Sequence, residues 1–171
     1  IEGARMGNCD LALGWMNYNK TLTLDGDIHR GIKTSKVSGF LSKPQDTIML
    51  KIDANDLNIG FLHNKINAFI SEAEGTANGT AYIAGQWSKV NLTGTVALDC
   101  NLKVKANNCT YTVDGDTIYM SPTAISFRDI DIKDTYGNRG KLTGDLNHRH
   151  FSQWKCNLNV KADNMLVYDT H

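Results

Sequence analysis

The sequence predicts an almost all-β domain of about a dozen short strands with one short helix. Apolar and polar residues alternate with a period of two along most of the chain, as they do in strands with one buried face. Only 2 prolines occur beside 15 glycines and many Thr, Asn and Asp residues. Thr, Val and Ile favour strands, whereas Asn, Asp and Gly supply turns. A glycine-centred unit also recurs, and such repetition is typical of strands that follow one another in a repetitive sheet.

One face of these expected strands is apolar along the whole chain. Residues i and i+2 of a strand point to the same side, so each strand contributes the residues of one parity. In chain order these are Leu22, Leu24, Ile28, Val37, Leu41, Ile48, Leu50, Ile52, Ile83, Val90, Leu92, Val96, Leu98, Leu102, Val104, Tyr111, Val113, Ile125, Phe127, Leu142, Leu146, Trp154, Leu158 and Val160.

The alternation is interrupted at a few places. "DGD" at residues 114–116 and "DTYGNRG" at residues 134–140 are expected to be turns, because Asp, Asn and Gly favour turn conformations. The apolar residues before and after residues 128–129 are out of phase, which predicts a β-bulge there.

Residues 55–75 depart from the strand pattern altogether. Their apolar residues recur near helical spacing, and we expect a helix of two or three turns between Asn55 and Glu74. The residues that set this spacing are Ile59, Leu62, Ile66, Phe69 and Ile70.

Five glycines are central to a unit in which an apolar residue stands two positions before and two positions after the glycine. They are Gly26, Gly39, Gly85, Gly94 and Gly144. Each therefore lies on the apolar face, where glycine costs conformational entropy and fills no space. We interpret these glycines as clearing room for an opposing sheet, a sharp bend or a ligand. Close backbone packing in an ordinary sandwich is an alternative.

Composition and motifs exclude several function classes. Eighteen basic residues balance eighteen acidic ones, so no net charge attracts nucleic acid. No apolar run is long enough for a membrane helix. No nucleophile elbow, P-loop or dinucleotide fingerprint occurs, and we expect neither an enzyme nor a cofactor. His148 and His150 could share a strand face, but no third ligand accompanies them and no metal site is expected.

The four cysteines leave the redox state open. Cys9, Cys100, Cys109 and Cys156 include no C-x-x-C pair, and their even number would allow two disulfides in an oxidising compartment. Cys156 is in phase with apolar neighbours, and we expect it to be a small buried hydrophobe.

The motifs together are similar to those of a known family. In chain order these motifs are "LTLDGDIHRG" (residues 22–31), "GTANGTAYIAGQW" (residues 75–87), "NLTGTVALDCNLKVKANNCTYTVDGDTIYMSPTAISF" (residues 91–127) and "DTYGNRGKLTGDLNHRHFSQWKCNLNVKADNMLVYDT" (residues 134–170). This arrangement resembles the C-terminal domain of unknown function of the TamB proteins, which belong to the AsmA-like bridge superfamily of lipid-transfer proteins. The likeness extends over nearly the whole chain.

The resemblance implies a fold, a place and a function. It implies that residues 1–171 are one segment of a β-taco, an open sheet curled around an apolar concave groove, within a longer TamB-like protein. That protein would be anchored in the inner membrane of a Gram-negative bacterium and cross the periplasm. The implied cargo is phospholipid acyl chains or nascent outer-membrane strands, and the implied roles are lipid transport and outer-membrane protein assembly or translocation. A BamA-type outer-membrane barrel would be met by regions outside residues 1–171.

A closed β-sandwich is the alternative architecture. Such a module would bind carbohydrate or protein, and a second sheet would cover its inner apolar face. An open sheet would instead leave a continuous apolar strip uncovered, of the kind that marks a binding surface.

Overall fold

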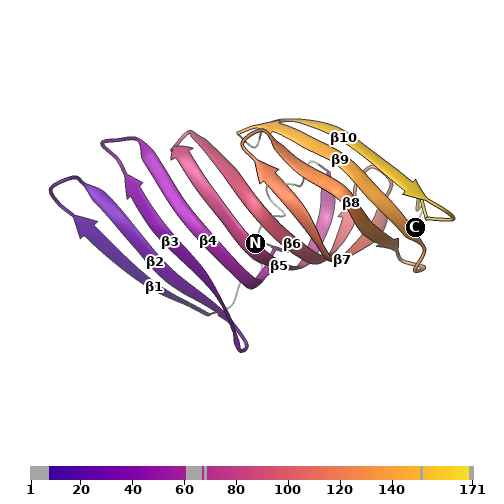
Figure 1. Ribbon diagram of the computed structural model, residues 1–171, viewed down its shortest axis with the longest axis horizontal. Helices are drawn as coiled ribbons and strands as arrows, with labels where there is room; N and C mark the ends of the chain where they lie inside the picture. Colours follow the sequence, from indigo (N-terminus) through magenta and orange to yellow (C-terminus); the bar gives the residue numbers. More distant parts are fainter. Residues whose placement is uncertain (1–7, 61–66, 68, 151, 170–171) are drawn as a thin grey trace.

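The computed structural model describes residues 8–60, 67, 69–150 and 152–169. Within them the chain forms one antiparallel sheet of ten strands, and each strand pairs with the strands next to it in the sequence (Figure 1). The strands are β1 (Asn8–Met16), β2 (Thr21–Arg30), β3 (Lys33–Ser42), β4 (Thr47–Asn58), β5 (Ile70–Gln86), β6 (Lys89–Val104), β7 (Cys109–Ser121), β8 (Ala124–Asp134), β9 (Arg139–Arg149) and β10 (Ser152–Ala162).

The all-β prediction is confirmed, and its finer details need correction. The described residues form ten strands in place of about a dozen. The apolar runs on the two sides of residues 114–116 belong to the single strand β7, and those on the two sides of residues 128–129 belong to the single strand β8. The expected helix is wrong at both ends, since β4 continues to Asn58 and β5 begins at Ile70. The middle of that helix, residues 61–66 and 68, lies outside the described residues. No helix in the described part of the chain is long and apolar enough to span a membrane.

Two of the predicted interruptions can be compared directly. The bulge predicted at residues 128–129 is confirmed, because the pairing of β8 with β9 shifts between Phe127 and Ile130. The turn predicted at residues 114–116 is wrong, because β7 runs through it. Gly115 is instead the extra residue of a bulge opposite β6, with φ of 70°. A positive φ at glycine serves either a turn or a bulge, so the sequence pattern alone could not separate them.

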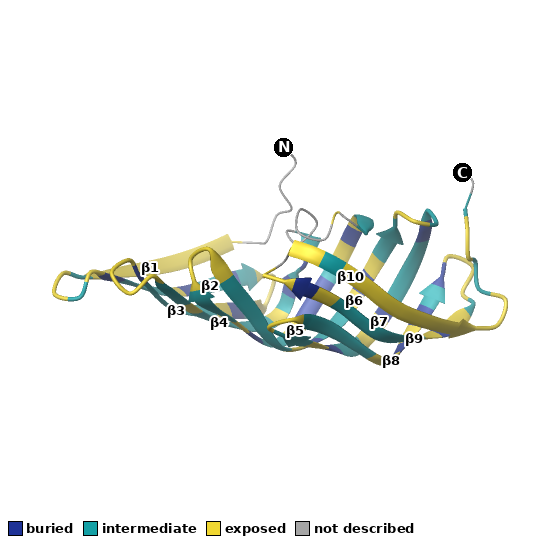
Figure 2. Ribbon diagram, turned by 90° about the horizontal axis from the view of Figure 1, so that it is seen from above, coloured by how far each residue is buried: buried dark blue, intermediate teal, exposed yellow. Residues whose placement is uncertain are grey.

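The curvature of the sheet is unequal along its length. The ribbon curves more strongly over β5–β10 than over β1–β4 (Figure 2). We call β1–β4 the open half and β5–β10 the curled half. Phe69, just before β5, contacts Trp154 in β10 with ring centroids 6.1 Å apart, although these strands are far from each other in the sheet order.

The main core lies inside the curled half. Its buried residues are Ile59, Ala77, Val96, Cys100, Val113, Ile118, Ile130 and Ile132. Partly buried side chains pack against them, namely Leu98, Leu102, Met120, Ile125, Phe127, Leu142 and Met165. Curvature lets the apolar face of β5–β9 pack against itself, and Ile59 and Met165 are added from the chain segments that follow β4 and β10.

Candidate functional site

The apolar side of the sheet is the candidate site, and the strand register defines it. One cross-strand row reaches through all ten strands with a residue from each. In strand order the row consists of Leu11, Gly26, Val37, Ile52, Ala81, Gly94, Met120, Ile125, Leu146 and Cys156. We call the side of the sheet that contains this row the apolar face. Directly paired residues of an antiparallel sheet share a face, so the row fixes which side every other residue occupies.

The residues predicted from the sequence lie on this face. The register places the apolar positions of β2 through β10 together, across the five register shifts between these strands. Trp154 lies beside the bulge of β10, and its ring is 5.0 Å from that of His148, which follows Leu146 by two positions in β9. Sequence analysis missed Leu11, Leu13 and Trp15 of β1, although their alternation with Ala12 and Gly14 is visible in the sequence.

Coverage of the apolar face changes from one end of the sheet to the other. Val96 and Val113 are 7% and 5% exposed in the core of the curled half. In β1, Leu11, Leu13 and Trp15 are 53%, 59% and 57% exposed. At the opposite edge, Val160 of β10 is 50% exposed. The face is therefore covered in the middle of the curled half and uncovered towards both edges.

The transition between the two halves coincides with a strand of small residues. Five successive apolar-face positions of β5 are alanine or glycine: Ala73, Gly75, Ala77, Gly79 and Ala81. No side chain longer than a methyl group stands on this stretch of the face. Ile59 can therefore approach the backbone of β5 as part of the same core. The three alanines are buried. The sequence contained this signal in "AEGTANGTA".

Trp154 makes two ring contacts within the described residues. Its edge-to-face contact with Phe69 joins β10 to the segment before β5, and its other partner, His148, lies on the adjacent strand β9. His148 is buried, and burial, followed by the nearby His150, lowers its pKa. A neutral imidazole is thus favoured beside the aromatic rings.

The chain after β10 turns back over β7 and β8. The Leu166 backbone N–H donates to Asp134 Oδ2 at 2.8 Å, and Tyr111 Oη donates to the Leu166 carbonyl at 2.9 Å. Asp134 also accepts hydrogen bonds from the Tyr136 and Asn138 backbone N–H groups at 2.9 Å each. This segment brings Met165 onto the core.

Four of the five predicted glycines have backbone conformations that other residues rarely adopt. Gly39, Gly85, Gly94 and Gly144 have φ of 152°, 136°, 141° and 118°. A Cβ at these positions would lie 2.0 to 2.6 Å from a carbonyl oxygen of the neighbouring strand. Gly26 has no such φ, and a Cβ there would meet Leu11 Cδ1 at 3.0 Å. The structure thus provides a backbone reason for glycine in addition to the predicted clearing of space.

The possible metal ligands and the four thiols are dispersed over the described part of the chain. No group of three or more His, Cys, Asp or Glu side chains is placed to bind a metal within the described ranges. Cys9, Cys100, Cys109 and Cys156 are all free thiols. Burial, followed by Asp99, raises the pKa of Cys100 to about 11, which keeps that thiol protonated at neutral pH. Cys156 was predicted to be buried and is exposed, because β10 is an edge strand.

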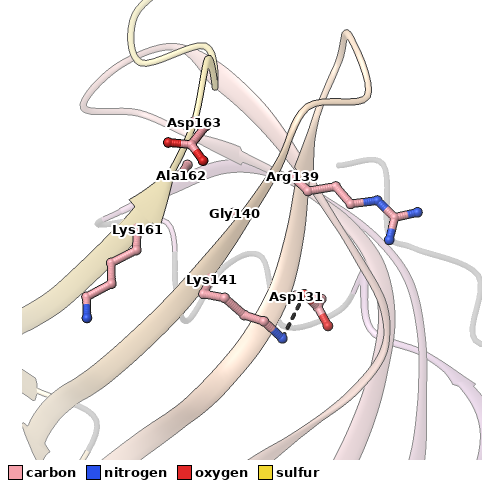
Figure 3. Close-up of a pocket in the computed structure, with 7 residues that line it drawn as sticks. All are labelled: Asp131, Arg139, Gly140, Lys141, Lys161, Ala162 and Asp163. Atoms are coloured by element: carbon pink, nitrogen blue, oxygen red, sulfur yellow. Dashed lines mark ion pairs between the residues drawn. The ribbon is translucent and has the colours of Figure 1, made fainter.

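A shallow cavity of about 250 Å³ lies beside the end of β8, the start of β9 and the end of β10 (Figure 3). It is lined by Asp131, Arg139, Gly140, Lys141, Lys161, Ala162 and Asp163. Lys141 Nζ pairs with Asp131 at 2.8 Å, whereas Arg139 and Lys161 extend in different directions. Asp131, Lys141 and Lys161 are register partners on the side opposite the apolar face. These three charged side chains thus extend from the side opposite the apolar face, and the cations of the cavity do not converge on one point.

Comparisons of this chain with protein-family models, with curated proteins and with solved structures found no match.

Proposed function

We propose that this sheet is a segment of a periplasmic bridge between the inner and outer membranes, and that its apolar face forms a groove for phospholipid acyl chains. The same groove could support outer-membrane protein assembly or translocation by holding nascent strands. The periplasmic location and the inner-membrane anchor of the longer protein rest on the sequence resemblance to TamB proteins. A BamA-type barrel would be the outer-membrane partner, through regions beyond residues 1–171.

The observation that supports this proposal is the apolar row that continues through ten strands to both edges. A sheet that served only as a core would end its apolar face under covering residues. Here Leu11 and Leu13 are more than half exposed at one edge, and Val160 is half exposed at the other. An exposed apolar strip of this kind is typical of a binding surface.

The dimensions of the sheet suit an acyl chain. Neighbouring strands are about 4.8 Å apart, so the four strands of the open half extend over about 15 Å. This is about half of the 30 Å hydrocarbon core of a bilayer, and thus about the length of one acyl chain. Burial of each CH2 group against the face would contribute about 0.8 kcal/mol without a specific headgroup contact.

The alternative of a closed β-sandwich has less support. A sandwich needs a second sheet over the apolar face, and the described residues form a single sheet. The curled half does bury its face, but by packing on itself and not against a second sheet. A carbohydrate- or protein-binding sandwich would thus require a second sheet from outside the described residues.

Tryptophan quenching would test the proposal. Trp15 is exposed on the apolar face of the open half, and Trp87→Phe with Trp154→Phe would leave it as the only tryptophan. Phospholipids brominated on their acyl chains quench a tryptophan that they contact. We expect saturable quenching of Trp15 by the brominated lipid, and none by the same lipid without bromine.

Two adjacent residues of β4 provide a matched control. Leu50 lies on the apolar face, and Met49 lies on the opposite face with 49% of its surface exposed. Leu50→Asp is expected to weaken lipid binding about tenfold or more, since a charge in the groove opposes acyl burial. Met49→Asp is expected to bind as the parent does. Thermal melting of both variants checks that they fold. Absence of quenching, or an equal loss in both folded variants, would contradict the proposal.

A further inference from the structure

Two basic residues stand at one end of the apolar face in the open half. Arg30 is the last residue of β2 and Lys33 is the first of β3, and the two are direct register partners. They lie four positions from Gly26 and Val37 of the apolar row, and the pairing of β2 with β3 contains no register shift. Both side chains therefore belong to the apolar face, at the hairpin that projects from one end of the sheet (Figure 1).

The charges of this pair repel each other. Among the paired apolar-face positions of β1–β4, Arg30 and Lys33 are the only charged residues. Like charges directly opposite each other destabilise a sheet. On the opposite face of the same two strands, Lys36 is instead the register partner of Asp27, with Nζ 3.9 Å from the carboxylate. An anion bound between Arg30 and Lys33 would offset their repulsion.

One of the two cations is fixed by a neighbouring strand. Arg30 Nη1 lies 3.2 Å from Asp56 Oδ2 and 3.3 Å from the Asp56 carbonyl oxygen. The Asp56 backbone N–H donates in turn to Asn78 Oδ1 at 2.8 Å. Both contacts of Arg30 use the same nitrogen of a guanidinium that has five N–H donors, so an anion can bind without displacing Asp56. Two cations and one carboxylate leave the site with a net positive charge.

We propose that Arg30 and Lys33 bind the phosphate of a phospholipid whose acyl chains lie on the apolar face. This inference rests on the function proposed above and adds a headgroup site to it. Arg binds phosphate through paired N–H donors and Lys binds it as a point charge. A phosphate compound without acyl chains would leave the adjoining apolar face unused, and a lipid without phosphate would leave the two cations unpaired.

The site also gives the lipid a direction on the sheet. Beyond the two cations the face continues to Leu11, which is opposite Gly26, and then to Trp15, which is opposite Leu22. Gly26 and Leu22 are four residues apart, or about 14 Å along the strand. This is close to the length of one acyl chain, about half of the hydrocarbon core of a bilayer. The phosphate therefore lies at the hairpin between β2 and β3, and the methyl ends of the acyl chains lie near Trp15.

Brominated lipids with and without a phosphate test the site. Trp15 is the reporter, in the intact chain with Trp87→Phe and Trp154→Phe. The probes are phosphatidylglycerol and diacylglycerol with the same brominated acyl chains, each presented in nonionic detergent micelles. We expect both to quench Trp15, with half-saturation at an at least tenfold lower concentration for phosphatidylglycerol. Equal concentrations for the two lipids would overturn the phosphate site and leave the acyl groove standing. Quenching by neither lipid would overturn the groove and the phosphate site together.

Three variants of the hairpin and of β3 separate the phosphate site from other sources of attraction. Lys33 and Lys36 are both exposed on β3, but on opposite faces of the sheet. Lys33→Gln should remove most of the preference for phosphatidylglycerol, and Lys36→Gln should keep it. Ile32 is 101% exposed at the hairpin tip, and Ile32→Ser should also keep the preference. An equal loss with Lys36→Gln would indicate unspecific charge attraction, and an equal loss with Ile32→Ser would indicate docking of the hairpin on the micelle surface. Either result would overturn the proposal.

Two further probes test the direction of the lipid and the source of the phosphate. Phosphatidylglycerol brominated near the methyl ends should quench Trp15 more strongly than the same lipid brominated near the esters, and the reverse order would overturn the proposed direction. Glycerol 3-phosphate carries the phosphate without acyl chains, and calorimetry should show binding at least a hundredfold weaker than that of phosphatidylglycerol. Equal affinity for the two would assign Arg30 and Lys33 to a soluble phosphate compound and overturn the proposal.

Discussion

The open half and the curled half follow the same rule of alternation but differ in what covers their apolar side chains. In the curled half, Val113 and Ile130 are 5% and 2% exposed and belong to a shared core. In the open half, Ile28 and Leu57 are buried, whereas the apolar side chains of β1 are exposed. The comparison shows that alternation determines which side of a strand is apolar but not whether that side becomes buried. In the curled half, burial accompanies the curvature of β5–β10 and two added side chains, Ile59 and Met165.

The largest expected effect is on the core of the curled half. Ile130→Ala should lower the free energy of unfolding by about 3 kcal/mol, because it removes a fully buried side chain and leaves a cavity. Urea unfolding followed by circular dichroism measures this. A loss below about 1 kcal/mol would mean that the curled half is not packed as a core, and the contrast between the halves would disappear.

The second-largest expected effect is the loss of stability on replacing a positive-φ glycine by alanine, and it should be equal in the two halves. Gly39 in the open half and Gly94 in the curled half both have φ above 140°, and a Cβ would lie 2.0 Å from the Met49 carbonyl oxygen or 2.3 Å from that of Thr80. Gly39→Ala and Gly94→Ala should each cost about 2 kcal/mol, since the constraint is in the backbone and independent of burial. Gly31→Ala is the control, because its φ is 61° but no atom lies within 4 Å of a Cβ there. It should cost about 1 kcal/mol or less.

These glycine variants also separate two explanations. If the glycines only cleared space for a ligand, Ala at position 94 would leave unfolding unchanged and alter binding alone. A stability loss at both positions, larger than that of Gly31→Ala, would assign them primarily to the backbone.

The third expected effect is on the pH dependence of stability, and it depends on Asp134 of β8 in the curled half. Burial by itself raises the pKa of Asp134, but hydrogen bonds from Asn138, Leu166 and Tyr136 outweigh it and lower the pKa to about 2. A pKa below the ordinary value of 3.8 means that ionised Asp134 stabilises the fold above about pH 4. This contribution is lost as the pH falls towards 2.

Asp134→Asn should therefore be less stable than the wild type at neutral pH and should lose less stability between pH 4 and pH 2. Thermal melts across this range measure both. Asp25→Asn, at an exposed carboxylate of β2, is the matched control and should follow the wild type. Parallel pH profiles for the wild type and Asp134→Asn would contradict the role of Asp134 in fixing the chain after β10.

The sequence was sufficient to predict the faces of the strands, and the reason is geometric. A period of two assigns each residue to a side without knowledge of its partners, so positions such as Leu24 and Leu142 were assigned from local pattern alone. The phase slip at residues 128–129 located a bulge for the same reason.

Properties that depend on distant partners could not be predicted in this way. Cys156 matched the apolar pattern and is exposed, because β10 is at the edge of the sheet that the described residues form. The contact of Phe69 with Trp154 joins residues 85 positions apart and depends on the curvature of the whole sheet. The alanines and glycines of β5 were a local signal for that curvature, but small residues alone do not specify the direction of a bend.

The smallest effect is expected in β1, and it would sharpen the comparison most. Leu11→Ala should change the free energy of unfolding by less than about 0.5 kcal/mol, since Leu11 is 53% exposed and its removal leaves no enclosed cavity. Urea unfolding followed by circular dichroism measures this change. A loss near that of Ile130→Ala would mean that β1 is packed as tightly as the core of the curled half. The open half would then be a second core, and its apolar face could not be free to bind an acyl chain.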